Sequence, residues 1–139
     1  MRFKHHDAEY ELPDDWWNEA GMRASLLSGS SYVGAPSQWP KLQVFELAIN
    51  DVQPVLRQGS HGVFNDNPEF GTAHDRVVQI LKGFRDRTSI PPIEVARLPS
   101  PQSPQFKLIH GVHRLYCSIA VGFSHVPAVE VVDFFGTYP

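Results

Sequence analysis

The chain has 139 residues, of which 42% are hydrophobic and 19% are charged, and its formal net charge is −3 at pH 7. This length and composition indicate one globular domain with a substantial core and leave too little chain for two domains. The acidic balance offers no bulk attraction to the phosphates that dominate the binding of duplex DNA. We therefore expect no strong nucleic-acid binding.

The single cysteine, Cys117, excludes a disulfide scaffold. No apolar stretch approaches the roughly 18 residues of a membrane span, and no secretory apolar region leads the chain. We therefore expect a cytoplasmic protein that does not bind membranes. Because Cys117 falls inside a helix-like run, we expect it to be a small buried thiol.

Residues 1–42 are expected to form an N-terminal extension that packs on the core. Residues 2–12 have a polar centre between two partly apolar arms, which is typical of a hairpin. Residues 13–21 have acidic residues near the start and glycine at the end, which predicts a short helix. Residues 28–40 are rich in Ser, Gly and Pro and predict a loop that lies across the core.

Large aromatic residues mark this extension and suit burial better than the stacking of nucleic-acid bases. A protein partner that covers them is the alternative. The doublet His5–His6 is expected to be exposed rather than to bind a metal. The large aromatic residues are Trp16, Trp17, Tyr32 and Trp39.

Residues 43–139 are expected to form the core domain. Phe45, Leu47 and Ile49 alternate onto one face of a strand. Thr72 and Asp75 resemble a helix-capping pair. The predicted elements are a strand over 44–49, a long loop over 61–70, a helix over 73–86, a strand over 90–98, a turn over 99–104, a strand over 106–109, a helix over 114–122 and a strand over 126–132.

A glycine turn between the last two apolar runs carries the clearest functional signal. The first turn of a helix has unpaired N–H groups and a positive dipole end, and an arginine there adds bidentate hydrogen bonds to an anion. This arrangement predicts a site for a nucleotide or another phosphorylated ligand. The predicted binding residues are His110, Gly111, Val112, His113 and Arg114.

The order of strand, strand, Gly-x-His-Arg turn, helix, glycine and Val-Pro strand resembles the ParB and sulfiredoxin superfamily over roughly residues 44–132. This resemblance implies an α+β (mixed α/β) fold, a small sheet flanked by helices, with His113 and Arg114 at the nucleotide phosphates. The residues that match are Pro91, Pro92, Ile93, Val95, Leu108, Ile109, Gly111, His113, Arg114, Leu115, Ala120, Gly122, Val126, Pro127 and Val129.

Three departures limit what the resemblance implies. Val112 stands where sulfiredoxins have their catalytic cysteine, so we expect no sulfinic-acid reduction. His110 stands where the free-serine kinases of the superfamily have an aspartate. The CTP-binding ParB proteins carry a Gly-Glu-Arg-Arg motif, and the Val112-His113 pair lacks its glutamate and its first arginine.

Two functions stay open at this point. The first is an ATP-dependent phosphotransferase that uses Mg²⁺ and ATP and acts on a small hydroxyl substrate, with Glu46 activating the hydroxyl and His113 donating a hydrogen bond or moving a proton. The second is a non-catalytic nucleotide-binding or protein-interaction module, since Glu46 equally suits the exposed face of its strand. His110 and His113 are too few to predict a zinc site. The arginines expected to be solvated are Arg57, Arg85, Arg87 and Arg97.

Overall fold

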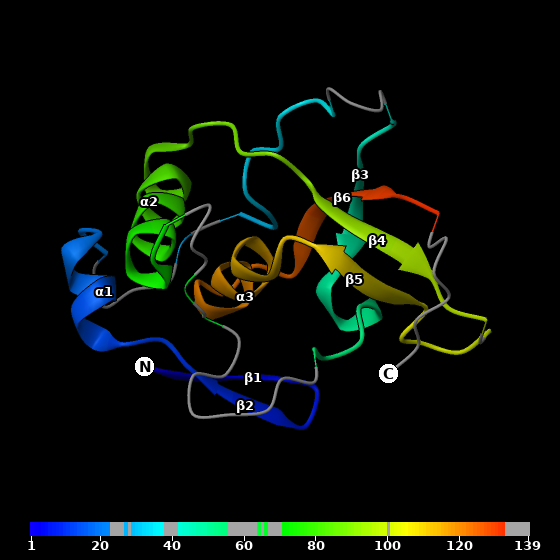
Figure 1. Ribbon diagram of the computed structural model, residues 1–139, viewed down its shortest axis with the longest axis horizontal. Coiled ribbons are helices and arrows are strands. Elements are labelled where there is room, and N and C mark those ends of the chain that lie inside the picture. The colour runs from blue at the N-terminus through cyan, green and yellow to red at the C-terminus, as the bar shows by residue number, and fades with distance from the viewer. Residues whose placement is uncertain are drawn as a thin grey trace.

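The chain folds as a mixed α and β protein with two sheets and three α-helices in the part that the structure describes (Figure 1). The computed structural model describes residues 1–22, 27, 29–37, 42–55, 64, 66, 71–99 and 101–132. The elements are β1 (Arg2–His5), β2 (Ala8–Glu11), α1 (Asp14–Glu19), β3 (Phe45–Ala48), a 3₁₀ turn (Ile49–Asp51), α2 (Ala73–Asp86), β4 (Ile93–Arg97), β5 (Phe106–His110), α3 (Val112–Ala120) and β6 (His125–Glu130).

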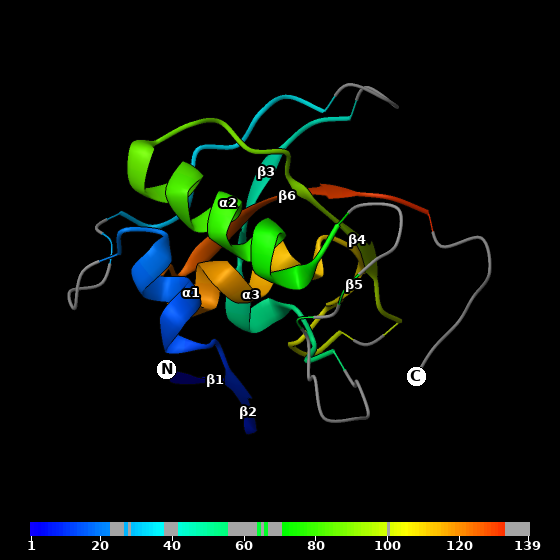
Figure 2. The ribbon, with the colours of Figure 1, turned by 60° about the vertical axis from the view of Figure 1, so that its left-hand side comes forward.

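The larger sheet has the strand order β3-β6-β4-β5. Its two central strands, β4 and β6, run parallel, while each outer strand is antiparallel to its neighbour. The chain passes from β5 through α3 to β6, and α3 packs against β4 and β6. The helix α2 packs on α3, and α1 packs on α2, so the helices form a layer beside the sheet (Figure 2). None of the helices in the described ranges is long and apolar enough to cross a membrane.

The helix predicted over 73–86 is confirmed as α2. Thr72 is its N-cap and its hydroxyl accepts a hydrogen bond from the Asp75 N–H at 3.1 Å, as the capping pair predicted. The helix ends where Arg87 turns into the left-handed region with φ of 59°. Cys117 is fully buried on α3, and burial raises the pKa of its thiol, so the thiol is protonated and inert.

Two predicted boundaries shift for backbone reasons. The strand expected from residue 90 begins only at Ile93, because Pro91 and Pro92 have no N–H to pair in a sheet. The helix expected from Arg114 begins two residues earlier, because Gly111 adopts a φ of 111° as its N-cap and its carbonyl accepts the Leu115 N–H at 2.9 Å. The turn glycine thus belongs directly to the helix start.

The N-terminal hairpin and short helix are confirmed as β1, β2 and α1. The hairpin packs on α3, and Leu12, Trp17 and Tyr32 are buried. The expectation that His5 is exposed is wrong, since its side chain is only 1% exposed, whereas His6 is exposed. Trp39 lies outside the described residues, as do most of the loop predicted over 61–70 and part of that over 28–40.

Candidate functional site

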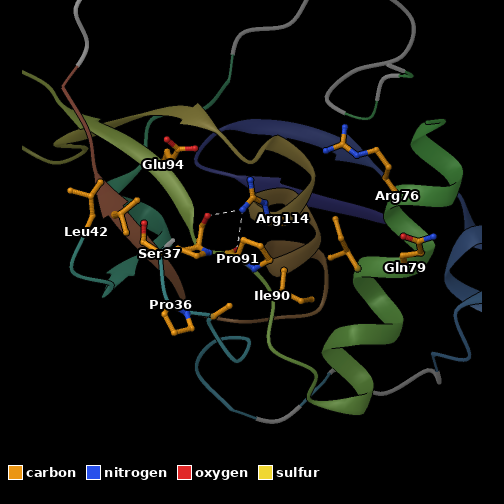
Figure 3. A pocket seen from close by; sticks show the side chains of 13 residues that line it. Pro36, Ser37, Leu42, Arg76, Gln79, Ile90, Pro91, Glu94 and Arg114 are labelled. Atoms are coloured by element: carbon orange, nitrogen blue, oxygen red, sulfur yellow. Dashed lines mark hydrogen bonds between the residues drawn. The ribbon is translucent and has the colours of Figure 1, made fainter. Parts of the chain in front are cut away.

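A pocket of about 780 Å³ opens where the start of β4 meets α2 and the first turn of α3 (Figure 3). Arg76 and Gln79 enter it from α2 on one side, while Ser37 and Leu42 lie on the other. The described residues that line it are Ala35, Pro36, Ser37, Leu42, Arg76, Gln79, Ile80, Ile90, Pro91, Pro92, Glu94, Arg114 and Val129.

Gly111 makes the tight connection from β5 into α3 possible. Its φ of 111° is one that L side chains rarely adopt, and a Cβ at this position would lie 2.8 Å from Cγ2 of Ile93. No side chain of the described residues caps the helix. The close approach to β4 places Arg114, in the first turn of α3, beside the pocket.

Arg114 is half-buried and is anchored at one end of its guanidinium. Its Nη1 donates hydrogen bonds to the carbonyl oxygens of Pro91 at 3.1 Å and Pro92 at 2.6 Å (Figure 3). Within the described residues, its Nε and Nη2 atoms donate to no acceptor. Burial lowers the pKa of Arg114, yet a guanidinium stays charged at any physiological pH. Three N–H donors are therefore left for a ligand.

Tyr32 supports this anchor from the N-terminal extension. Its hydroxyl donates to the Pro91 carbonyl at 2.7 Å, so that oxygen accepts from both Tyr32 and Arg114. The Tyr32 ring stacks on Phe84 of α2 with centroids 5.0 Å apart. Burial raises the pKa of the Tyr32 hydroxyl, which therefore remains a neutral donor.

Two further charges act on Arg114 within the pocket. The positive charge of Arg76 lowers the pKa of Arg114, and the negative charge of Glu94 raises it, which places both groups within electrostatic reach. Two guanidinium groups beside one carboxylate favour a ligand with more than one negative charge. The apolar wall formed by Leu42, Ile80 and other aliphatic side chains suits an uncharged ring or chain on the same ligand.

The residues of the predicted phosphate turn do not stay together. Arg114 lines the pocket and Gly111 adjoins it, but His110 is exposed at the end of β5 and Val112 packs against the core. His113 is only 5% exposed and its ring stacks on Phe64 with centroids 5.7 Å apart. His113 is therefore not among the described residues of the pocket.

Glu46, predicted as a catalytic carboxylate, lies on the outer strand β3. Its side chain is exposed and accepts a hydrogen bond from the Ser31 hydroxyl at 2.9 Å. It does not belong to the described pocket lining, so Glu46 and Arg114 do not share this cavity. The structure does not bring the two predicted catalytic residues, Glu46 and His113, into this pocket.

Sequence reasoning missed Arg76, Gln79, Glu94 and Tyr32 as residues of the site. Three of them left a readable signal in the sequence. Arg76 and Gln79 are three residues apart in α2 and so share one helix face. Glu94 is a charged residue within the largely buried strand β4. Burying an unpaired charge costs free energy, so a charge within such an apolar run indicates a functional role. The role of Tyr32 depends on a fold contact that spans 59 residues and left no local pattern.

In the described ranges no group of three or more His, Cys, Asp or Glu side chains is arranged to hold a metal ion.

No protein-family model matches the chain, and no curated protein is significantly similar to it in sequence. The resemblance to the ParB and sulfiredoxin superfamily therefore stays a prediction, and the chemistry of the pocket is the basis for a function.

Proposed function

We propose that this chain binds a nucleotide or a closely related phosphorylated small molecule, with Arg114 as the main phosphate contact. The observation that carries the proposal is the state of the Arg114 guanidinium. One nitrogen is fixed by two carbonyl oxygens, while Nε and Nη2 have no hydrogen-bond acceptor among the described residues. A fixed guanidinium with an open edge is well suited to bidentate recognition of a phosphate group.

The size and lining of the pocket support the same ligand class. A volume of about 780 Å³ lies within the range of small-molecule sites. Arg76 supplies a second cation for a di- or triphosphate, and the aliphatic wall that includes Leu42 and Val129 offers a surface for a base. The resemblance to the ParB and sulfiredoxin superfamily also favours a phosphate contact at the Gly111 turn. ATP with Mg²⁺ is accordingly the first ligand to test.

The proposal extends to binding and not to phosphoryl transfer. Transfer to an acceptor hydroxyl would need a base or a positioning group beside the phosphate chain. Glu46, predicted for this role, bonds Ser31 outside the described lining of the pocket, and His113 is buried against Phe64. A protein-interaction role is less favoured, because Trp17 and Tyr32 of the aromatic extension are already buried within the chain.

Isothermal titration calorimetry with ATP, CTP, GTP and AMP, each with and without Mg²⁺, tests the proposal. Arg114→Ala is expected to weaken binding by about 1.5–3 kcal/mol, which is about 10- to 150-fold. Arg114→Lys keeps the positive charge but loses the planar guanidinium, so we expect its affinity to lie between those of the wild type and Arg114→Ala. Thermal unfolding of each variant shows whether loss of the Pro91 and Pro92 bonds has changed the fold.

Arg97→Ala is the matched control. Arg97 is an exposed arginine that pairs with Glu130 at 2.9 Å and does not line the pocket. This variant is expected to bind as the wild type does. Absence of binding by the wild type to every nucleotide would refute the proposal, as would equal losses in Arg114→Ala and Arg97→Ala.

A further inference from the structure

Glu94 and Arg114 face the same pocket from adjoining elements, yet they do not pair. Glu94 comes from β4 and Arg114 from the first turn of α3, and Figure 3 shows both at the cavity. Their opposite charges attract each other, but within the described residues the two side chains form neither an ion pair nor a hydrogen bond. The pocket thus holds a separated donor and acceptor.

This separation selects for a particular ligand chemistry. Nε and Nη2 of Arg114 require an acceptor or an anion, whereas an ionised carboxylate such as Glu94 can only accept hydrogen bonds. A polyphosphate ion offers acceptors alone and would be repelled by Glu94. A ribonucleotide offers phosphate oxygens and, a few bonds away, two neighbouring hydroxyl donors that suit the two oxygens of one carboxylate.

We propose that Glu94 accepts hydrogen bonds from the ribose hydroxyls of the bound nucleotide and makes the pocket selective for ribonucleotides. The inference rests on the proposed function, because it needs the phosphate chain to lie at Arg114. A site that hydrogen-bonds a ligand hydroxyl rejects the analogue without it, since its own polar group is then desolvated and left unpaired. Because Glu94 is only half-buried, we expect a moderate preference of about tenfold.

The test measures dissociation constants of ATP, 2′,3′-dideoxy-ATP and tripolyphosphate, all with Mg²⁺, for the wild type, Glu94→Gln and Glu130→Gln. The wild type is expected to bind ATP about tenfold more tightly than the dideoxy analogue. Glu94→Gln is expected to reduce this preference at least threefold and to bind tripolyphosphate more tightly than the wild type does. Glu130 is an exposed glutamate of β6 paired with Arg97, so Glu130→Gln is expected to change neither value.

Each other outcome has a distinct meaning. If Glu94→Gln strengthens the binding of all three ligands by the same factor, Glu94 is only a repelling charge and the inference is overturned. If the wild type binds ATP and its dideoxy analogue equally, the protein does not recognise the ribose hydroxyls and the inference is overturned. Binding of both ligands would still support the phosphate site at Arg114. If the wild type binds none of the three ligands, the proposed nucleotide site fails together with the inference. The ligand series on the wild type needs no variant to fold.

Discussion

The two sides of helix α3 differ in how far their polar groups are satisfied by hydrogen bonds within the chain. On the side that faces the hairpin, the Tyr116 hydroxyl accepts the Val55 N–H at 2.8 Å and lies 3.2 Å from the Tyr10 hydroxyl and 3.4 Å from Nδ1 of His5. On the side that faces the pocket, Arg114 has donors with no acceptor among the described residues. Polar groups that are satisfied internally stabilise the fold, and those left open can bind a ligand.

His5 shows how complete the network on the hairpin side is. Its Nε2 lies 3.1 Å from the Ile49 carbonyl, which can only accept, so Nε2 carries the proton. Nδ1 then carries no hydrogen in the neutral ring, and it lies 3.4 Å from the Tyr116 hydroxyl, which donates its proton to the Tyr10 hydroxyl. Burial lowers the pKa of His5 and keeps the ring neutral. The hairpin is thereby tied to the core through hydrogen bonds as well as through apolar contacts.

The largest expected effect comes from deleting residues 1–42, which removes the whole hairpin side. The deletion takes away Leu12 and Trp17 from the core and leaves Tyr116 uncovered. We expect an unfolded or insoluble product, recognised by loss of dispersed NMR signals and of a cooperative urea transition. A truncated chain that stays folded, monomeric and equally stable would show that the hairpin side is an appendage that does not stabilise the fold.

Gly111→Ala is expected to disturb both sides, because this residue is the junction from which α3 starts. The left-handed φ and the 2.8 Å approach to Ile93 act together, so we expect a loss of about 2–4 kcal/mol in the free energy of unfolding. Gly71→Ala is the matched control, with a φ of 102° but no atom of the described residues within 4 Å of the added Cβ. It should lose about 1–2 kcal/mol. Urea unfolding of the two variants measures how much of the loss comes from the contact of the added Cβ with Ile93. Equal losses in both variants would show that this contact contributes nothing.

Tyr116→Phe and Tyr32→Phe separate the two sides with the same chemical change. Removing the Tyr116 hydroxyl leaves partly buried partners unsatisfied, so we expect a loss of about 1–3 kcal/mol in stability and unchanged nucleotide affinity. Removing the Tyr32 hydroxyl loosens the Pro91 carbonyl that anchors Arg114, so we expect weaker nucleotide binding by a few fold and a smaller stability loss. Chemical denaturation and calorimetry measure the two quantities. Equal losses of stability and of nucleotide affinity in the two variants would contradict the distinction between the hairpin side and the pocket side of α3.

The sequence predicted the elements of this chain better than the arrangement of its site. Hydrophobic period and capping residues are local, so the helix at 73–86 was predicted with its observed bounds and the hairpin and strands nearly so. His113 and Arg114 are also adjacent in sequence, which suggested one phosphate site. In a helix, however, successive side chains point about 100° apart, and one of these residues turns to Phe64 while the other turns to the pocket.

Most of what sequence reasoning missed depends on contacts between distant segments. The pocket joins a loop of the extension, α2, the start of β4 and the first turn of α3, and no local pattern states that these four meet. The burial of His5 likewise follows from the Ile49 carbonyl, 44 residues away, rather than from its neighbours. Glu46 lies on a strand, as predicted, but this strand is at the sheet edge, where the exposed Glu46 side chain meets Ser31 instead of the pocket for which a catalytic role was predicted.

The smallest expected effect is a pH dependence at the contact between α1 and α2. His74 pairs with Glu19 and, at 2.9 Å, with Asp75, and the hydrogen bond to Glu19 is the main cause of its raised pKa. A pKa raised above the ordinary value of 6.5 means that this stabilisation is fully present below pH 6.5 and is lost as the pH rises through the folded value. His74→Gln should therefore reduce the melting temperature at about pH 5.5 and have little effect at about pH 8.5.

His110→Gln is the control, since His110 is exposed and forms no ion pair in the described part of the chain. A loss at His74 that grows toward high pH would have the wrong sign and would exclude this pairing as its cause.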